Sequence, residues 1–229
     1  MPPVTLAELL ERNERHVAAL PEDHFAAVIN EQRPRVVSIC CSDSRVPQAG
    51  MWSVEKAGWL FTPSTIGNQV QDTFGGKQVV DGSVVYPLQH TDTSVVVVVG
   101  HTGCGAIAAA LSYVQTGTIS VAPGIEKWVT SLAPIVQDGL EDDRIDVDGE
   151  LPVIDQLVEY NVDRQIQFLL DSDDIDEQTT VYGFVYDFKG TYGDDRGRAY
   201  LTNVNGNTDI DELRSLVGDT YQHAVVRII

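Results

Sequence analysis

The sequence has few cysteines and no long hydrophobic run. Its 229 residues include only three cysteines, which cannot pair evenly, so metal or thiol chemistry in a reducing compartment is a stronger expectation than a disulfide framework. No stretch approaches the roughly 20 apolar residues of a membrane span. The first segment, MPPVTLAELLERNERHV, is amphipathic and charged rather than a signal peptide. We therefore expect a cytoplasmic protein that does not act at a membrane.

Positive charge is also scarce. Lys and Arg number 15, of which four are lysines, against 34 Asp and Glu, so the net charge is -19. Such a surface repels nucleic acid, and we expect no nucleic-acid partner. An acidic, lysine-poor exterior without low-complexity tracts is typical of a folded protein in a salt-loaded cytoplasm, because salt screens the self-repulsion. A mesophilic protein with one acidic face is the alternative.

The pattern of apolar residues predicts an N-terminal helical arm over residues 1–30. Thr5 and Glu8 have the spacing of a capping box, and leucines then recur at helical intervals. Pro21 ends this helix, and the segment HFAAVIN indicates a second, short helix. The arm is expected to precede the main body of the protein.

The rest of the chain predicts an α/β fold with a central, mostly parallel sheet flanked by helices. PRVVSICC and TSVVVVVG are continuous apolar runs typical of strands buried on both faces. Between and after them lie helical segments, including one from Pro152 to about Leu170, and VYGFVYDF and AYLTNV are later strands. No composition shift marks a boundary, so we expect one domain over residues 1–229.

Two polar motifs directly follow the two buried strands. CSDSR begins at Cys41 and HTGCG begins at His101. Because ligands gather at the carboxyl ends of parallel strands, Cys41, His101 and Cys104 would converge there as a Cys₂His set with one position open, which is the pattern of catalytic zinc. Core filling is the alternative interpretation of the cysteines. Cys40 should face the other side of its strand and act as a small buried hydrophobe.

Together, the CSDSR and HTGCG motifs resemble the paired motif of the β-class carbonic anhydrases, and the resemblance extends along most of the chain. It implies one zinc ion per chain, held by Cys41, His101 and Cys104. It also implies reversible hydration of carbon dioxide to bicarbonate and a proton by zinc-bound hydroxide. Combined with the acidity, the resemblance suggests a haloarchaeal member of the family.

The resemblance also assigns roles beside the metal. Asp43 and Arg45 match the family's catalytic pair: Asp43 would accept the hydroxide's hydrogen bond, and Arg45 would keep Asp43 ionised and oriented. Gly103 is expected beside the substrate. Two alternatives stay open. The same scaffold could hydrolyse carbon disulfide or carbonyl sulfide, or the protein could be a non-catalytic zinc- or bicarbonate-binding protein.

Four positions favour the open, plant-like subtype of this family. Gln32 and Tyr86 have the offsets from the two motifs that this subtype uses to line its substrate pocket. The other subtype carries a tryptophan at the position of Ser38 and an arginine at a position near Ser64, and this chain has neither. The resemblance further implies a homodimer or a higher homo-oligomer, in which Gln32 serves the neighbouring subunit's zinc.

Overall fold

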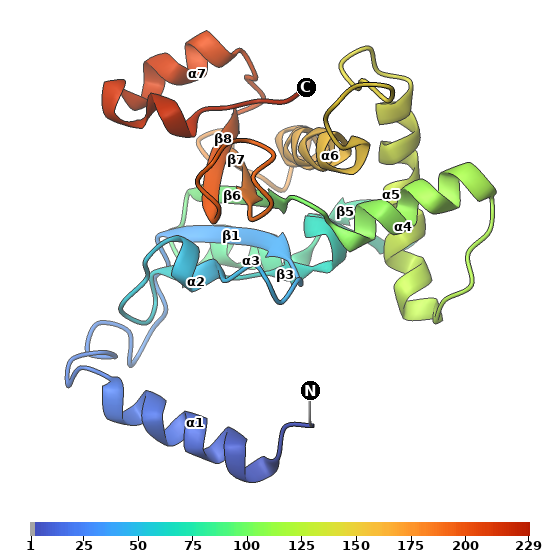
Figure 1. The fold of residues 1–229 in the computed structure, drawn as a ribbon. Helices are drawn as coiled ribbons and strands as arrows, with labels where there is room; N and C mark the ends of the chain where they lie inside the picture. The colour runs from blue at the N-terminus through green and yellow to red at the C-terminus, as the bar shows by residue number, and fades with distance from the viewer. Residues whose placement is uncertain (1–2) are drawn as a thin grey trace.

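The computed structural model describes residues 3–229 as a mostly parallel sheet flanked by helices, with one N-terminal helix standing apart (Figure 1). The strand order is β2-β1-β6-β7-β8, and β3 pairs with the last residues of β1. All pairings in this sheet are parallel except that of β8 with β7. The predicted fold class is therefore confirmed. The strands are β1 (Val36–Cys41), β2 (Leu60–Phe61), β3 (Ser64–Thr65), β6 (Val95–His101), β7 (Thr180–Asp187) and β8 (Arg198–Val204).

The helices cover the sheet and fill the connections between strands. A small antiparallel hairpin, β4–β5, lies outside the main sheet. Among residues 3–229, no helix combines the length and the apolar character needed to cross a membrane. These elements are α1 (Leu6–Ala19), α2 (Gln48–Met51), α3 (Gly82–His90), α4 (Gly105–Thr116), α5 (Pro123–Leu140), α6 (Val153–Leu170), α7 (Ile210–Val217), β4 (Gln71–Phe74), β5 (Lys77–Val80) and the 3₁₀ helices Ile66–Asn68 and Asp219–Ala224.

Strands β1 and β6 form the centre of the sheet, as their apolar runs predict. Five of the six residues of β1 and six of the seven of β6 are buried. Their register pairs Val37 with Val96 and Cys40 with Val99 in the same direction. The two strands therefore end at the same edge of the sheet, β1 at Cys41 and β6 at His101.

Helix α6 packs closely against the end of β6 and the middle of β7 because glycines in the strands leave room for it. A Cβ at Gly100 would lie 2.8 Å from methyl carbons of both Val158 and Val162. A Cβ at Gly183 would similarly lie 2.7 Å from Ile166 Cδ1. The helix that was predicted from Pro152 to about Leu170 is thus held next to the strand end that carries His101.

The N-terminal arm departs from the prediction in its second half. Helix α1 forms with Thr5 as its N-cap, and the Thr5 hydroxyl accepts a hydrogen bond from the Glu8 amide. The prediction of a second short helix over HFAAVIN is wrong. Residues 22–28 instead form successive turns with isolated i to i+3 hydrogen bonds. Phe25 and Ile29 are exposed there, so the segment lacks the packing that stabilises so short a helix.

Helix α1 also has little packing against the rest of residues 3–229. None of its residues is buried, and Figure 1 shows it apart from the sheet. Its exposed apolar side chains include Leu6, at 74% exposure, and Leu10, at 60%. Isolated helices of 14 residues are marginal in water, so α1 gains little stability from the contacts it makes in this structure.

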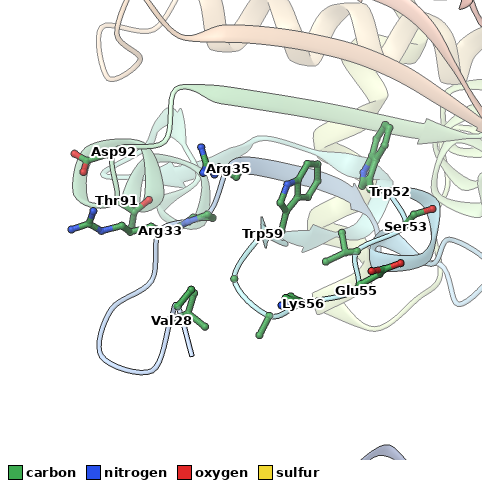
Figure 2. A pocket seen from close by; sticks show the side chains of 15 residues that line it. Val28, Arg33, Arg35, Trp52, Ser53, Glu55, Lys56, Trp59, Thr91 and Asp92 are labelled. Atoms are coloured by element: carbon green, nitrogen blue, oxygen red, sulfur yellow. The ribbon is translucent and has the colours of Figure 1, made fainter. Parts of the chain in front are cut away.

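A cavity of about 720 Å³ lies at the amino ends of β1, β2 and β6 (Figure 2). It is lined by residues that immediately precede these strands, including Arg35, Trp59 and Asp92, and by Val28 of the arm. Cys41 and His101 end their strands at the opposite edge of the sheet. This cavity is therefore separate from the predicted metal site.

Gly100→Ala tests the close approach of α6 to β6. The added methyl group meets Val158 and Val162 in a packed interior, so we expect the free energy of unfolding to fall by about 1–3 kcal/mol in urea titrations. Gly124→Ala is the matched control because a Cβ there meets nothing within 4 Å. Equal stability of the two variants would contradict this account of the packing.

Candidate metal centre

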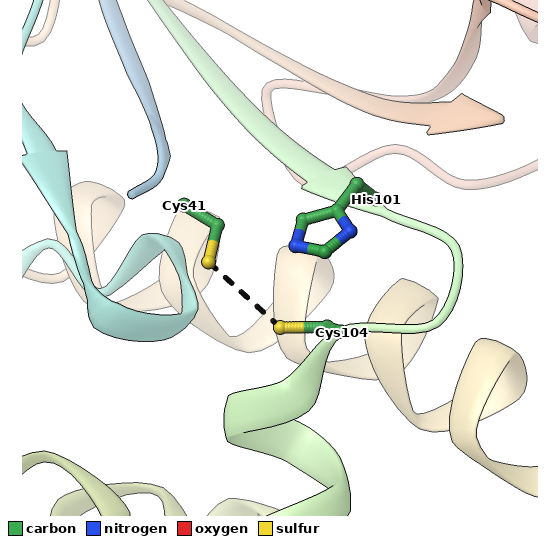
Figure 3. A group of neighbouring side chains, drawn as sticks. All are labelled: Cys41, His101 and Cys104. Atoms are coloured by element: carbon green, nitrogen blue, oxygen red, sulfur yellow. Dashed lines mark hydrogen bonds between the residues drawn. The ribbon is translucent and has the colours of Figure 1, made fainter. Parts of the chain in front are cut away.

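The structure brings the three predicted ligands together at the carboxyl edge of the sheet (Figure 3). Cys41 ends β1, His101 ends β6, and Cys104 is the N-cap of α4. The two Sγ atoms are 4.0 Å apart, and the ligand atoms of all three residues lie within 4.8 Å of one another. All three side chains are buried. The convergence predicted from the two strand ends is confirmed.

The His101 ring is oriented as a metal ligand would be. Its Nδ1 lies 3.0 Å from the Thr102 carbonyl oxygen, so the Nδ1–H donates there and Nε2 keeps its lone pair. Nε2 has no hydrogen-bond partner although the residue is only 1% exposed. A buried polar atom without a partner costs about 1–3 kcal/mol. Two thiols and this unsatisfied imidazole nitrogen fit a zinc ion with three protein ligands.

Cys41 is stabilised as a thiolate by its neighbours. Its Sγ accepts hydrogen bonds from the Cys104 thiol and from the Gly67 amide, at 4.0 and 3.4 Å. These contacts and the nearby His101 lower the pKa of Cys41 to about 4, whereas the same thiol contact and burial raise the pKa of Cys104. Gly67 has φ of 73°, and a Cβ there would lie 2.7 Å from Leu132 Cδ1, so only glycine brings this amide to the sulfur.

Cys40 takes no part in the site. It lies on the other face of β1, fully buried in a cluster with Val97 and Val99. Burial raises the pKa of its thiol to about 12. The interpretation of Cys40 as a small buried hydrophobe is confirmed.

Asp43 and Arg45 form a tight pair beside the three ligands. Asp43 Oδ1 accepts from the Arg45 amide and from Nε, at 2.9 and 2.8 Å, and Oδ2 accepts from Nη2 at 2.6 Å. Chiefly because of the Arg45 side chain, the pKa of Asp43 lies well below its usual range. Oδ2 is also 3.7 Å from His101 Nε2. The carboxylate is thus ionised, fixed and adjacent to the ligand group.

The sequence reasoning missed an aromatic side chain that supports both halves of the site. The Phe188 ring stacks on His101, with centroids 5.8 Å apart and planes 25° apart. The Arg45 guanidinium lies over the same ring, 4.4 Å from its centroid. The one available signal was that Phe188 directly follows the strand VYGFVYD, at the same edge of the sheet as the two motifs.

The three predicted substrate-binding residues are not gathered at the site of one chain. The Gly103 amide donates to Asp155, and its carbonyl accepts from Arg45. Gln32 precedes β1 and is exposed, at the opposite edge of the sheet from Cys41. Tyr86, on α3, lies with its ring 6.3 Å from that of Phe61, next to the amino half of β1. Only Gly103 lies beside the ligand group in this chain.

Comparisons with known proteins agree with this geometry. The carbonic anhydrase family model matches residues 36–192. Carbonic anhydrase 2 of Mycobacterium tuberculosis is 30% identical over 207 residues, which cover 87% of this chain and 92% of that protein. A β-carbonic anhydrase structure from Coccomyxa covers 96% of both chains, with 23% identity and a TM-score of 0.70. One of the tetrameric β-carbonic anhydrases of Sordaria macrospora covers 79% of this chain and 91% of its own, with 22% identity and a TM-score of 0.65.

The fold and the Cys₂His group define an α/β metalloprotein with a three-ligand zinc site. With the family match and the M. tuberculosis relative, the chain belongs to the β-class carbonic anhydrase family. The activity of this family is the hydration of carbon dioxide, and Cys41, His101 and Cys104 are the group typical of its zinc site.

Cys104→Ser and Cys40→Ser together test the ligand set. We expect Cys104→Ser to lose the metal, because a serine hydroxyl is a poor replacement for a thiolate ligand. Cys40→Ser should keep one zinc per folded chain, since Cys40 lies on the other face of the strand. Metal analysis of the purified proteins measures both. Stoichiometric zinc in Cys104→Ser would show that the ligand set is wrong.

Proposed function

We propose that this protein hydrates carbon dioxide reversibly with Asp43 and Arg45 as its catalytic pair, in the open arrangement in which Asp43 is not a metal ligand. The observation that carries this proposal is the contact of the fixed, ionised Asp43 carboxylate with the buried Cys41–His101–Cys104 group. A bound zinc supplies Lewis acidity, which lowers the pKa of water to about 7 and so provides hydroxide as the nucleophile at neutral pH.

Asp43 orients the nucleophile in this proposal. An ionised carboxylate can only accept hydrogen bonds, so Asp43 accepts the nucleophile's O–H and leaves an oxygen lone pair directed at the substrate carbon. Arg45 keeps Asp43 ionised and in one orientation through its two-pronged contact. Phe188 supports the pair from one side by lying under the guanidinium.

The contacts of Asp43 support the open arrangement over a closed one. Both carboxylate oxygens are engaged by Arg45, at 2.8 and 2.6 Å, and a ligating aspartate would have to give up part of this contact. The tryptophan of the closed subtype is replaced by Ser38, whose hydroxyl accepts instead from Trp52 Nε1. We infer that Asp43 stays with Arg45 when the metal is bound.

We infer further that the working unit is a homodimer or a higher homo-oligomer. Helix α1 has an apolar side that nothing in residues 3–229 covers, and a second copy of the chain would bury it. Gln32 precedes β1 and Tyr86 lies next to the amino half of β1, away from their own chain's metal group, so they would serve the site of a partner subunit. The S. macrospora relatives are tetrameric. Gly103, whose amide is engaged by Asp155, would contact the substrate through its Cα.

We also infer that the protein works at high salt, as a haloarchaeal source would require. Its net charge of -19 disfavours a compact chain at low ionic strength. At about 1 M salt the Debye length falls to about 3 Å, so repulsion between exposed carboxylates is largely screened.

Asp43→Asn tests the catalytic pair. The amide keeps the shape of the side chain but presents an N–H where the nucleophile needs an acceptor, so hydration should fall by about 10²–10⁴-fold with zinc retained. Stopped-flow assays and metal analysis measure the two quantities.

Asp142→Asn is the matched control for that variant. Asp142 and Arg144 make the same three hydrogen bonds as Asp43 and Arg45, but on the loop after α5. The Asp142→Asn variant should keep a hydration rate within about twofold of that of the original protein, as expected for a surface pair. Full activity in Asp43→Asn would show that its assigned role is wrong.

The double variant Leu6→Asp, Leu10→Asp tests the role of α1. Charges on the apolar side of the helix should dissociate the oligomer in sedimentation experiments and reduce hydration, because Gln32 and Tyr86 then lose their partner site. Arg12→Gln, which removes only the exposed pair with Glu8, should keep the oligomer. An active, monomeric original protein would contradict the dimer proposal.

A further inference from the structure

Two buried carboxylates hold the short loop between the ligands His101 and Cys104. Neither carboxylate has a role in the proposed hydration of carbon dioxide. Thr102 donates its hydroxyl to Asp187 Oδ1 at 3.1 Å, and Gly103 donates its amide to Asp155 Oδ1 at 2.5 Å. Both carboxylates are fully buried. Asp187 also accepts three amides of the loop after β7, as a loop-capping residue does, so its contacts are accounted for by that loop. The contacts of Asp155 are not explained by capping of a loop in this way.

Asp155 is a fully buried acid for which residues 3–229 provide no ion-pair partner. Within residues 3–229, no Lys, Arg or His nitrogen forms an ion pair with it at 4.0 Å or less. It lies in the first turn of α6, where the partial positive charge of the helix N-terminus favours a carboxylate. Its partners are the Gly103 amide and the Thr191 hydroxyl, which donates to Oδ2 at 2.8 Å. The side chain thus joins α6, the metal loop and the loop after β7.

The contact with Gly103 fixes the turn that delivers Cys104. Gly103 has φ of 64° and lies between His101 and Cys104. Without an acceptor its amide would be a part-buried, unpaired donor, which favours a different turn. The Gly103 carbonyl accepts from Arg45 Nη2 at 3.4 Å, so the same turn also contacts the catalytic pair.

We propose that Asp155 is a positioning residue of the metal centre: its carboxylate holds the Gly103 amide and so sets the position of the Cys104 sulfur. The inference rests on the proposed function only in taking the bound metal to be zinc. Asp155 acts through the loop and not as a metal ligand, because both of its oxygens accept hydrogen bonds from protein donors. Helix α6 can reach the loop because Gly100 lets it pack against β6.

Asp155→Leu and Asp155→Asn separate this role from general stability. Leucine fills the space without an acceptor, and we expect zinc affinity to fall about 10- to 100-fold in competition with a chromophoric chelator. Asparagine keeps an oxygen for the Gly103 amide and can donate to Thr191, so it should restore affinity to within a few-fold. The visible spectrum of the cobalt-substituted protein reports ligand geometry without relying on activity. It should change in Asp155→Leu and not in Asp155→Asn.

Asp163→Asn is the control on the same helix. Asp163 pairs with Arg227 and accepts from Asn203, away from the metal loop. The Asp163→Asn substitution should lower the melting temperature while leaving zinc affinity and the cobalt spectrum unchanged. If Asp155→Leu binds zinc like the original protein, or if Asp163→Asn weakens zinc binding equally, the proposal is overturned.

Hydrogen exchange of the original protein gives a test that does not depend on a variant folding. The Gly103 amide should be protected in both the metal-free and the zinc-loaded protein, because Asp155 accepts it in either case. Rapid exchange at Gly103 in both would overturn the proposal. The readouts are separable from the proposed function: loss of zinc affinity in Asp155→Leu supports the positioning role even if the original protein does not hydrate carbon dioxide.

Discussion

The alignment of β1 and β6 is the constraint on which the site depends. Their parallel pairing, from Val37 with Val96 to Cys40 with Val99, makes both strands end at one edge. Cys41 and His101 are the last residues of the two strands, so the buried apolar pairing that stabilises the sheet also sets the distance between two ligands. A shift by one residue would turn Cys41 to the other face of the sheet, where Cys40 now lies.

The third ligand depends on contacts that are not part of the sheet. Cys104 follows a sharp turn at Gly103. Asp155 on α6 accepts from the Gly103 amide, and Arg45 donates to the Gly103 carbonyl. These contacts require α6 to approach closely, which the bare backbone at Gly100 permits. Backbone packing and buried carboxylates therefore position the three buried ligands, next to which the half-buried Asp43 and the exposed Arg45 lie.

The parts that the sequence predicts are those governed by local pattern. Continuous apolar runs predict the central strands, period-two alternation predicts that Cys40 faces away, and the two motifs predict the ligands. Tertiary contacts escape such reasoning: Asp155 is 52 residues from Gly103, and Phe188 reaches the site only because β7 pairs with β6. The short helix expected over HFAAVIN, residues 24–30, does not form because the segment finds no core to pack against. The role of Gln32 and Tyr86 stays a prediction, because neither residue lies beside the metal group of its own chain.

The central claim is that the protein hydrates carbon dioxide through its Cys41–His101–Cys104 group. The most direct measurement is stopped-flow hydration by the zinc-loaded protein, in dilute and in molar potassium chloride, with a chelated sample alongside. The account predicts hydration well above the buffer rate that persists in molar salt and disappears with the metal. No hydration above buffer in either salt, with one zinc per chain and the fold intact, would contradict it.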